Sequence, residues 1–185
     1  MPSELTLVKP VALPTQSAVA AIYESVNLAD AFAVQLPFGT SSDPDVLWRF
    51  LIAQQPSWIG WLTNIRDAIV AFFGLKTAKH LATLSNEASV DRIGIFKVYG
   101  RSATEIVLGE DDKHLDFRLS VLHTPDLSPA RGGQLTVSTV VHCHNLLGRA
   151  YISVIAPFHR QVVKASLRRA ANVGWPKASA PRRHQ

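Results

Sequence analysis

The feature that most constrains the fold is a change in hydrophobic period at about residue 94. From there on, apolar and polar residues alternate in four stretches: "GIFKVY" (94–99), "TEIVLGE" (104–110), "HLDFRLSVLHT" (114–124) and "QLTVSTVVHCH" (134–144). Alternation is typical of strands, because successive side chains point to opposite faces of a sheet. The connections "GRSA", "DDK" and "PDLSPARGG" are rich in turn-forming residues. The sequence therefore predicts an antiparallel meander of four strands.

Another strand and two helices are predicted ahead of this meander. The segment "ADAFAVQLPF" (29–38) alternates like a strand. In "GTSSDPD", Asp43 can cap a helix and Pro44 suits the first helical position, so a helix is expected from there to about Gln55. An apolar stripe at helical spacing predicts a second helix over about 57–73.

A long amphipathic helix is predicted from about Leu146 to Val173. One of its sides is basic and the other is apolar, with Arg149, Arg160, Lys164 and Arg168 on the first and Leu147, Tyr151, Val154, Ile155, Phe158 and Val162 on the second. Pro157 lies inside this helix and is expected to bend or divide it, because proline lacks the backbone donor. We expect the apolar side to face the sheet.

Length and composition predict one domain. The 185 residues are 47% apolar, enough for one well-filled core. We expect an irregular segment over 1–28, a single domain over 29–174 and a disordered basic tail over 175–185. The predicted class is α+β, with an antiparallel sheet curled around the C-terminal helix.

The charge of the chain is unevenly distributed. Residues 1–126 hold all fourteen acidic residues and ten Lys/Arg, whereas residues 127–185 hold nine Lys/Arg and no acid. A basic region can attract nucleic acid or an anionic membrane. No nucleic-acid motif accompanies it, so we expect no nucleic-acid partner and interpret the charges as a solvated helix face and a tail.

Other sequence features bear on location. No apolar stretch reaches about eighteen residues, so no membrane span is expected. The N-terminal "MPSELTLVKPVALPTQSAV" does not resemble a signal peptide. The chain has one cysteine and therefore no internal disulfide, which favours a cytoplasmic location. We expect no cofactor, because no Gly-rich phosphate loop, nucleophile elbow or zinc-type cysteine pair occurs.

The stretch "HCHN" (142–145) raises the question of a thiol or metal site. Cys143 points to the opposite face from His142 and His144, so it is expected to be a small buried apolar residue rather than a nucleophile. If the strands 114–124 and 134–144 pair so that residue numbers sum to 258, the candidate metal ligands share one sheet face: His114, Asp116, His142 and His144. The alternative, which we favour, is a solvated face without metal.

The order of elements resembles that of the helix-grip fold, seen in START-like and Bet v 1-like (SRPBCC-like) proteins. The local sequence resembles a bacterial family, domain-of-unknown-function family 2867, over most of residues 29–172. The pieces that carry the resemblance are "ADAFAVQLP", "WLTNIRDAIVAFFGLK" (61–76), "EIVLGEDDKHLDFRLSV" (105–121) and "TVSTVVHCHNLLGRAYISVIAPFHRQVV" (136–163). The resemblance assigns no activity, and it implies an association with NAD(P)-binding oxidoreductase domains. Its polar motif members are Asp112, His114, Asp116, Arg149, Tyr151, His159 and Arg160, for each of which a structural role is the alternative.

The sequence leaves four hypotheses open. The first is a module that binds a small apolar molecule between sheet and last helix. Its candidate cavity residues are Phe96, Val98, Ile106, Leu108, Phe117, Leu119, His123, Val137, Thr139, Val141, Ile155, Phe158 and Val162. The second is a cyclase, dehydratase or isomerase that uses His123 or His159 as acid or base in that cavity. The others are metal binding on the outer sheet face and docking on an oxidoreductase.

Overall fold

The structure, a computed structural model, describes residues 7–56, 58–60, 91–126 and 131–178. Within these residues, strands form one antiparallel sheet with the order β1-β2-β7-β6-β5-β4-β3. The strands are β1 (Lys9–Pro10), β2 (Leu28–Pro37), β3 (Arg92–Ile93), β4 (Phe96–Arg101), β5 (Glu105–Asp111), β6 (Leu115–Thr124) and β7 (Arg131–Cys143), and the helices with given bounds are α1 (Pro44–Ala53) and α4 (Leu146–Val173).

This architecture confirms the predicted α+β class, the antiparallel meander and the long C-terminal helix, and it is consistent with a helix-grip arrangement. The second predicted helix, over 57–73, lies outside the described residues apart from 58–60, which are helical. In the described part of the chain, neither helix combines the length and apolar character that crossing a membrane requires.

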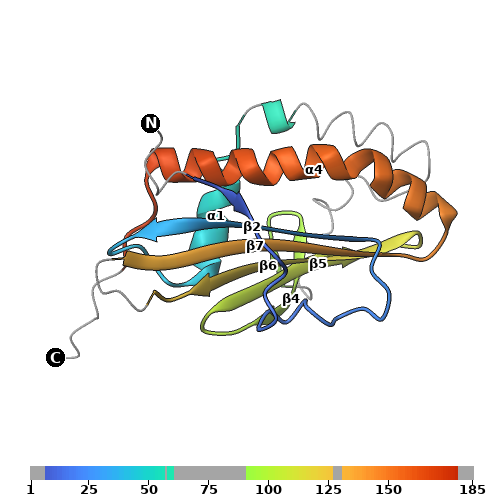
Figure 1. Cartoon of the computed structure of the whole chain (residues 1–185), viewed down its shortest axis with the longest axis horizontal. Helices are drawn as coiled ribbons and strands as arrows, with labels where there is room; N and C mark the ends of the chain where they lie inside the picture. The colour runs from blue at the N-terminus through green and yellow to red at the C-terminus, as the bar shows by residue number, and fades with distance from the viewer. Residues whose placement is uncertain (1–6, 57, 61–90, 127–130, 179–185) are drawn as a thin grey trace.

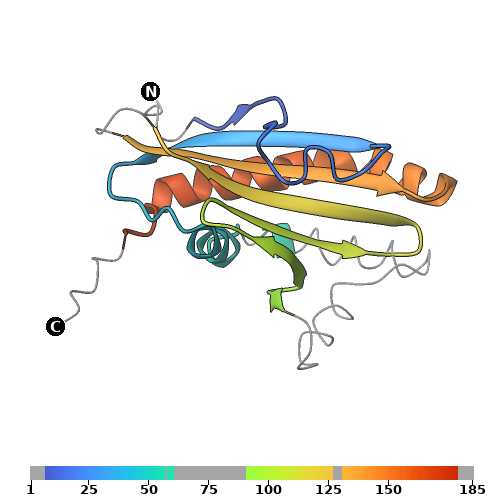
Figure 2. The same cartoon turned by 90° about the horizontal axis from the view of Figure 1, so that it is seen from below.

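The two faces of the sheet are covered by different structures, a helix on one and an irregular segment on the other. Helix α4 runs along one face, and the segment over 11–27 crosses the opposite face (Figures 1 and 2). Both edges of the sheet are two-residue strands, β1 and β3. Short edges of this kind, one of them containing Pro10, offer few free backbone groups to another chain.

Helix α1 begins as the sequence predicted. The Asp43 side chain accepts a hydrogen bond from the Asp45 backbone N–H at 2.9 Å, and Pro44 occupies the first turn. The helix buries Leu47 and Leu51 in the core on the α4 side of the sheet. The first backbone N–H groups of a helix have no acceptor within the helix. Asp43 supplies an acceptor for one of them and Pro44 lacks an N–H, so both residues favour a helix start at this point.

Strands β6 and β7 pair as predicted, in the register that was considered for the candidate metal ligands. Leu115 pairs with Cys143 and Asp116 pairs with His142, so paired residue numbers sum to 258. Odd-numbered residues of both strands therefore face α4, and even-numbered residues face the N-terminal segment. The helix-facing side is the main core: Phe32, Val34, Leu36, Ile106, Leu108, Leu119, Val121, Leu135 and Val137 pack there against α1, α4 and Trp175.

The side of α4 that faces the sheet differs from the prediction. The predicted apolar stripe included Val154 and Phe158, yet these side chains are 58% and 52% exposed. The buried positions are instead mostly small: Gly148, Ala156, Val163, Ser166, Leu167 and Ala170. Large residues on the sheet already fill the space between the layers, so the helix approaches through its small side chains. The helix is continuous through Pro157 and bends toward its N-terminal end rather than dividing (Figure 1).

Strand β7 begins earlier than predicted, because Arg131, Gly132 and Gly133 belong to it rather than to the preceding loop. A Cβ atom on Gly132 would lie 1.9 Å from the Pro37 carbonyl oxygen. Gly133 has a φ of 91°. Gly132 thus permits a tight approach to β2, where the pairing is irregular between Gln35 and Pro37, and Gly133 permits one to the Thr124 carbonyl at the end of β6.

Two expectations about the chain ends need correction. The segment predicted to be irregular, 1–28, includes β1. Residues 175–178, assigned to a disordered tail, are docked on the domain: Trp175 is buried, and the Ser41 N–H donates to the Pro176 carbonyl at 2.8 Å. Trp175 contributes to the core, which explains why this part of the tail is held in place.

The close packing of β5 against β6 predicts that a larger residue at position 109 destabilises the fold. A Cβ atom on Gly109 would lie 2.2 Å from the Phe117 carbonyl oxygen, whereas one on Gly100 meets nothing within 4 Å. We expect Gly109→Ala to lower the free energy of unfolding by about 1–3 kcal/mol through overpacking. Gly100→Ala, in the neighbouring strand β4, should leave it unchanged or raise it by about 0.4–1 kcal/mol. Urea denaturation measures both, and equal effects would contradict the proposed steric cause.

Candidate functional site

A hollow of about 360 Å³ lies between the start of β2 and the N-terminal part of α4. We call it the β2–α4 hollow, and its lining residues are Asn27, Leu28, Arg149, Ile152, Ser153, Ala156, Pro157 and Arg160. It combines residues of the leading strand with residues of the "LGRAY" and "PFHR" motifs, which are far apart in the sequence. The tertiary structure thus brings two of the predicted motif residues, Arg149 and Arg160, to one place.

Local helix geometry explains this gathering. Positions 152 and 153 lie three and four residues after 149, and 156 and 160 continue the same spacing, so these positions share one side of α4. The helix begins at the Asn145 cap, whose side-chain oxygen accepts from the Gly148 N–H at 3.0 Å. A Cβ on Gly148 would lie 2.2 Å from the His114 carbonyl oxygen, so glycine lets the first turn sit directly on β6.

Arg160 is oriented by an acidic residue of β2. Its Nε donates to both carboxylate oxygens of Asp30, at 3.0 and 3.1 Å. The Asp30 side chain is 12% exposed and that of Arg160 is 43% exposed. Asp30 was not among the predicted site residues, although an acid within the apolar alternation of "ADAFAVQLP" marks a helix-facing polar position.

Arg149 and Tyr151 occupy different environments. Arg149 is exposed at the hollow and, among the described residues, forms no ion pair with an acidic side chain. Tyr151 is half-buried against the apolar cluster of Leu28, Leu115 and Cys143. Of these two motif residues, Arg149 is therefore the one placed to meet a ligand.

His159 points into the protein rather than into the hollow. Its Nε2 lies 3.0 Å from the Thr139 hydroxyl oxygen, on the inner face of β7. Burial lowers the pKa of His159, with Asp30 opposing that shift and Arg160 adding to it. The ring is therefore neutral near pH 7 and bonded to a core hydroxyl.

The structure does not bring His123 to His159. His123 lies near the end of β6, where its Nε2 is 3.0 Å from the Gly132 carbonyl oxygen. Thr139 pairs instead with Leu119, four positions earlier on β6. The two histidines proposed as acid or base are thus held separately, each by its own hydrogen bond.

Most predicted cavity residues are core residues. Ile106, Leu108, Leu119, Val137, Thr139 and Val141 are buried, while Phe96, Val98, Phe117, Ile155 and Val162 are partly buried. Phe158 is exposed and does not face the sheet. None of the predicted cavity residues lines the β2–α4 hollow. The space among the sheet residues is occupied by α1 and the C-terminal half of α4.

The predicted metal ligands share a sheet face, where His144 and Asp116 contact each other while His114 and His142 bond to other residues. His144 Nε2 lies 3.1 Å from Asp116 Oδ1, and His142 Nδ1 lies 2.8 Å from the Ser25 carbonyl oxygen. His114 Nδ1 lies 2.9 Å from the amide nitrogen of the Asn145 side chain. Asp112 accepts a bond from the Lys113 N–H in the turn between β5 and β6. In the described ranges, no group of three or more His, Cys, Asp or Glu side chains is arranged to hold a metal ion.

The outer face is covered rather than solvated in its central part. Arg118 lies on the sheet face that was predicted to be solvated, yet it is 8% exposed, and its guanidinium lies 3.5 Å from the centre of the Tyr99 ring. It also bonds Asp111 at 2.7 Å, and the ring centre of Tyr23, in the N-terminal segment, lies 5.8 Å from its guanidinium carbon. Burial raises the pKa of Tyr23 to about 12, with the Arg118 charge opposing that shift. The small outward residues of β6 and β7, such as Ser120 and Ser138, are the signal that this face is covered.

A buried carboxylate holds the N-terminal segment in place. Glu105 is 7% exposed and accepts hydrogen bonds from the hydroxyls of Ser17 and Ser120. The Ala18 N–H also donates to it, at 3.0 and 3.2 Å from its two oxygens. Together with the apolar contacts of Val19 against Val107, these bonds fix the segment on the sheet. The contact between Glu105 and this segment was not predicted, because residues 1–28 show no hydrophobic period.

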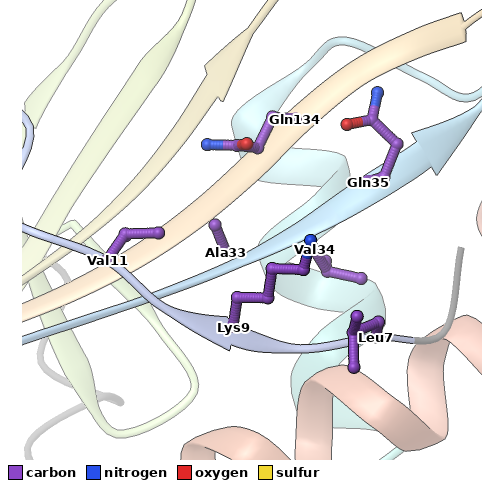
Figure 3. Close-up of a pocket in the computed structure, with 7 residues that line it drawn as sticks. All are labelled: Leu7, Lys9, Val11, Ala33, Val34, Gln35 and Gln134. Carbon is purple, nitrogen blue, oxygen red and sulfur yellow. The ribbon is translucent and has the colours of Figure 1, made fainter. Parts of the chain in front are cut away.

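A second hollow, of about 130 Å³, lies where β1 leaves β2 (Figure 3). Leu7, Lys9, Val11, Ala33, Val34, Gln35 and Gln134 line it. Gln35 donates to the Gly133 carbonyl at 2.9 Å, so its amide serves the β2–β7 junction. The hollow is smaller and has one charged lining residue, which makes it the weaker candidate.

The burial of His159 predicts a pH dependence of stability. Because its pKa is lowered in the folded protein, the unfolded chain takes up a proton first as the pH falls below about 6.5. The contribution of this group is therefore present above that pH and is lost as the pH falls through the folded-state pKa. We expect His159→Gln to flatten the acid limb of the unfolding free energy, measured by denaturant titration at several pH values. His142→Gln is the control, and identical slopes in both variants would contradict this assignment.

The environment of Cys143 predicts that its thiol reacts slowly in the native protein. The residue is 3% exposed, and burial raises its pKa, with the charge of Arg149 opposing that shift. Because the thiolate is the reactive form, Ellman's reagent at about pH 8 should label native protein slowly and the denatured chain fully. Labelling of native protein at the rate of free cysteine would show that the thiol is accessible and ionised.

One comparison with known protein families matches a range of residues that contains the β2–α4 hollow. The model of the family described as "Protein of unknown function (DUF2867)" matches residues 22–166. This range includes every residue that lines the β2–α4 hollow and excludes β1. No curated protein and no solved structure matches the chain. Because the match covers well over half of its length, the chain belongs to the DUF2867 family.

Proposed function

We propose that this protein is a binding module for a small, largely apolar molecule, held in the β2–α4 hollow. The observation that carries the proposal is the hollow itself, of about 360 Å³, formed by an apolar floor and a polar rim. Small-molecule sites usually have this composition and volumes of about 300–1,000 Å³. All of its lining residues fall within the range matched by the family.

The floor supplies the driving force for binding. Leu28 and Ala156 belong to the apolar cluster beneath the hollow, and Ile152 packs against that cluster. Apolar ligand surface placed on these side chains leaves water, and this transfer is favourable in proportion to its area. The rim residues Asn27, Ser153 and Arg160 offer polar groups that orient a bound molecule.

Binding is better supported than catalysis. An acid or base must reach the reacting atoms of the substrate, and neither His123 nor His159 lines the hollow. His159 is bonded to Thr139, and His123 is bonded to the Gly132 carbonyl. Docking on an NAD(P)-dependent oxidoreductase and a cytoplasmic location stay predictions from the resemblance and the composition.

Filling the hollow tests the proposal. Ser153 is an exposed lining residue of α4, and a phenylalanine there would occupy the hollow without disturbing the core. We expect 1-octanol to shift the methyl NMR signals of Leu28 and Ile152 in the native protein. Ser153→Phe should abolish these shifts, because the ring occupies the ligand's place.

The control is Ala150→Phe, an exposed position of α4 that does not line the hollow. It should leave the octanol shifts intact. Native mass spectrometry of freshly purified protein complements the titration, since an organic ligand lost on denaturation should be absent from Ser153→Phe. Shifts that survive in Ser153→Phe, or that centre on Leu47 in the main core, would refute the proposed location.

A further inference from the structure

We infer that the β2–α4 hollow carries a subsite for a carboxylate, so that its ligand is an organic acid with an apolar body. This inference rests on the proposed function and adds the ligand class. It comes from the arrangement of hydrogen-bond donors at the rim, which differ in their existing partners.

The guanidinium of Arg160 is bonded through its Nε, while its terminal nitrogens are available for a ligand within the described part of the chain. Its Nε is bonded to both oxygens of Asp30, which fixes the plane of the guanidinium. Among the described residues, its two terminal nitrogens have no hydrogen-bond or ion-pair partner. Two parallel N–H groups of a fixed guanidinium match the two oxygens of a carboxylate.

Asn27 likewise presents a donor. Its side-chain oxygen accepts a bond from the Cys143 N–H at 2.7 Å, so the amide group is held in one orientation. Within the described part of the chain, its side-chain nitrogen has no partner. An amide that is oriented by its oxygen offers the ligand its N–H groups.

The charge around the hollow is positive. Asp30 offsets Arg160, but Arg149 has no acidic partner among the described residues. Helix α4, from Leu146 to Val173, contains five Lys/Arg and no acidic residue. A ligand acid group therefore meets uncompensated positive charge, whereas a ligand cation would be repelled.

The floor restricts the remainder of the ligand. Leu28, Ile152 and Ala156 provide apolar contact, so a fully polar anion such as inorganic phosphate would leave this surface in water. The combination favours a molecule that joins one carboxylate to a short chain or ring. The volume of about 360 Å³ suits a ligand of that size.

The experiment compares three probes that share an eight-carbon chain: octanoate, 1-octanol and octylammonium. Calorimetric or NMR titration of the full chain measures each affinity. We expect octanoate to bind at least about tenfold more tightly than 1-octanol, because its bonds to Arg160 and Arg149 are charge-assisted. Octylammonium should bind more weakly than either. Raising the salt concentration should weaken octanoate binding and leave 1-octanol binding unchanged.

The variants separate charge from geometry. Arg149→Ala removes an exposed cation, and Arg160→Lys keeps the charge but loses the paired N–H groups. Each should lower octanoate affinity and spare that of 1-octanol. Arg168→Ala is the matched control, because it removes an exposed cation of α4 that does not line the hollow. Unfolding midpoints of the variants confirm that each remains folded.

The outcomes distinguish the two proposals. If octanoate and 1-octanol bind equally in the hollow, the carboxylate subsite is refuted and the apolar binding function stands. If octylammonium binds most tightly, the inferred ligand charge is wrong. If none of the three probes perturbs Leu28 or Ile152, the proposed function fails and the subsite fails with it.

Discussion

Strand β7 hydrogen-bonds to β2 along one side and to β6 along the other, and its register determines where the polar residues of this protein lie. A shift of one residue would exchange the two faces of the strand, placing His142 in the core and Val141 outside. Both pairings are long. Gly132 lets the start of β7 meet the end of β2 at close range, and Gly133 does the same for the end of β6. The hydrophobic face, the position of Thr139 and the placement of α4 all depend on this register.

Each face of the sheet is covered by a different kind of structure. The inner face is apolar and receives α1 and α4, whereas the outer face receives an irregular segment held by Glu105. A buried carboxylate is costly unless its oxygens are hydrogen-bonded, and here Ser17, Ala18 and Ser120 supply the donors. A segment with few apolar residues can thus be fixed by polar contacts at one point and apolar contacts nearby.

The hollow lies where one side of α4, with small and polar residues, meets the start of β2. Glycine at position 148 brings its first turn onto β6, and small residues such as Ala156 line the side nearest β2. The Asp30–Arg160 pair then joins helix and strand across this region. Two features of the helix that serve packing, a short side chain and a fixed arginine, therefore also create a space with oriented donors.

The sequence by itself determined the class of the fold, the strands of the meander, the capped start of α1 and the length of α4, because each depends on local periodicity or on a local cap. It also predicted that β6 and β7 pair as neighbours and which of their residues share a face, since alternation decides the face of each residue. Only the tertiary structure decided which side of α4 meets the sheet, because shape complementarity favoured small residues over the large apolar stripe that included Phe158. The same holds for the partnership of Asp30 with Arg160 and for the burial of Glu105, each of which joins residues that are distant in sequence. Such contacts follow from how elements lie in space, and no local pattern in the chain encodes them.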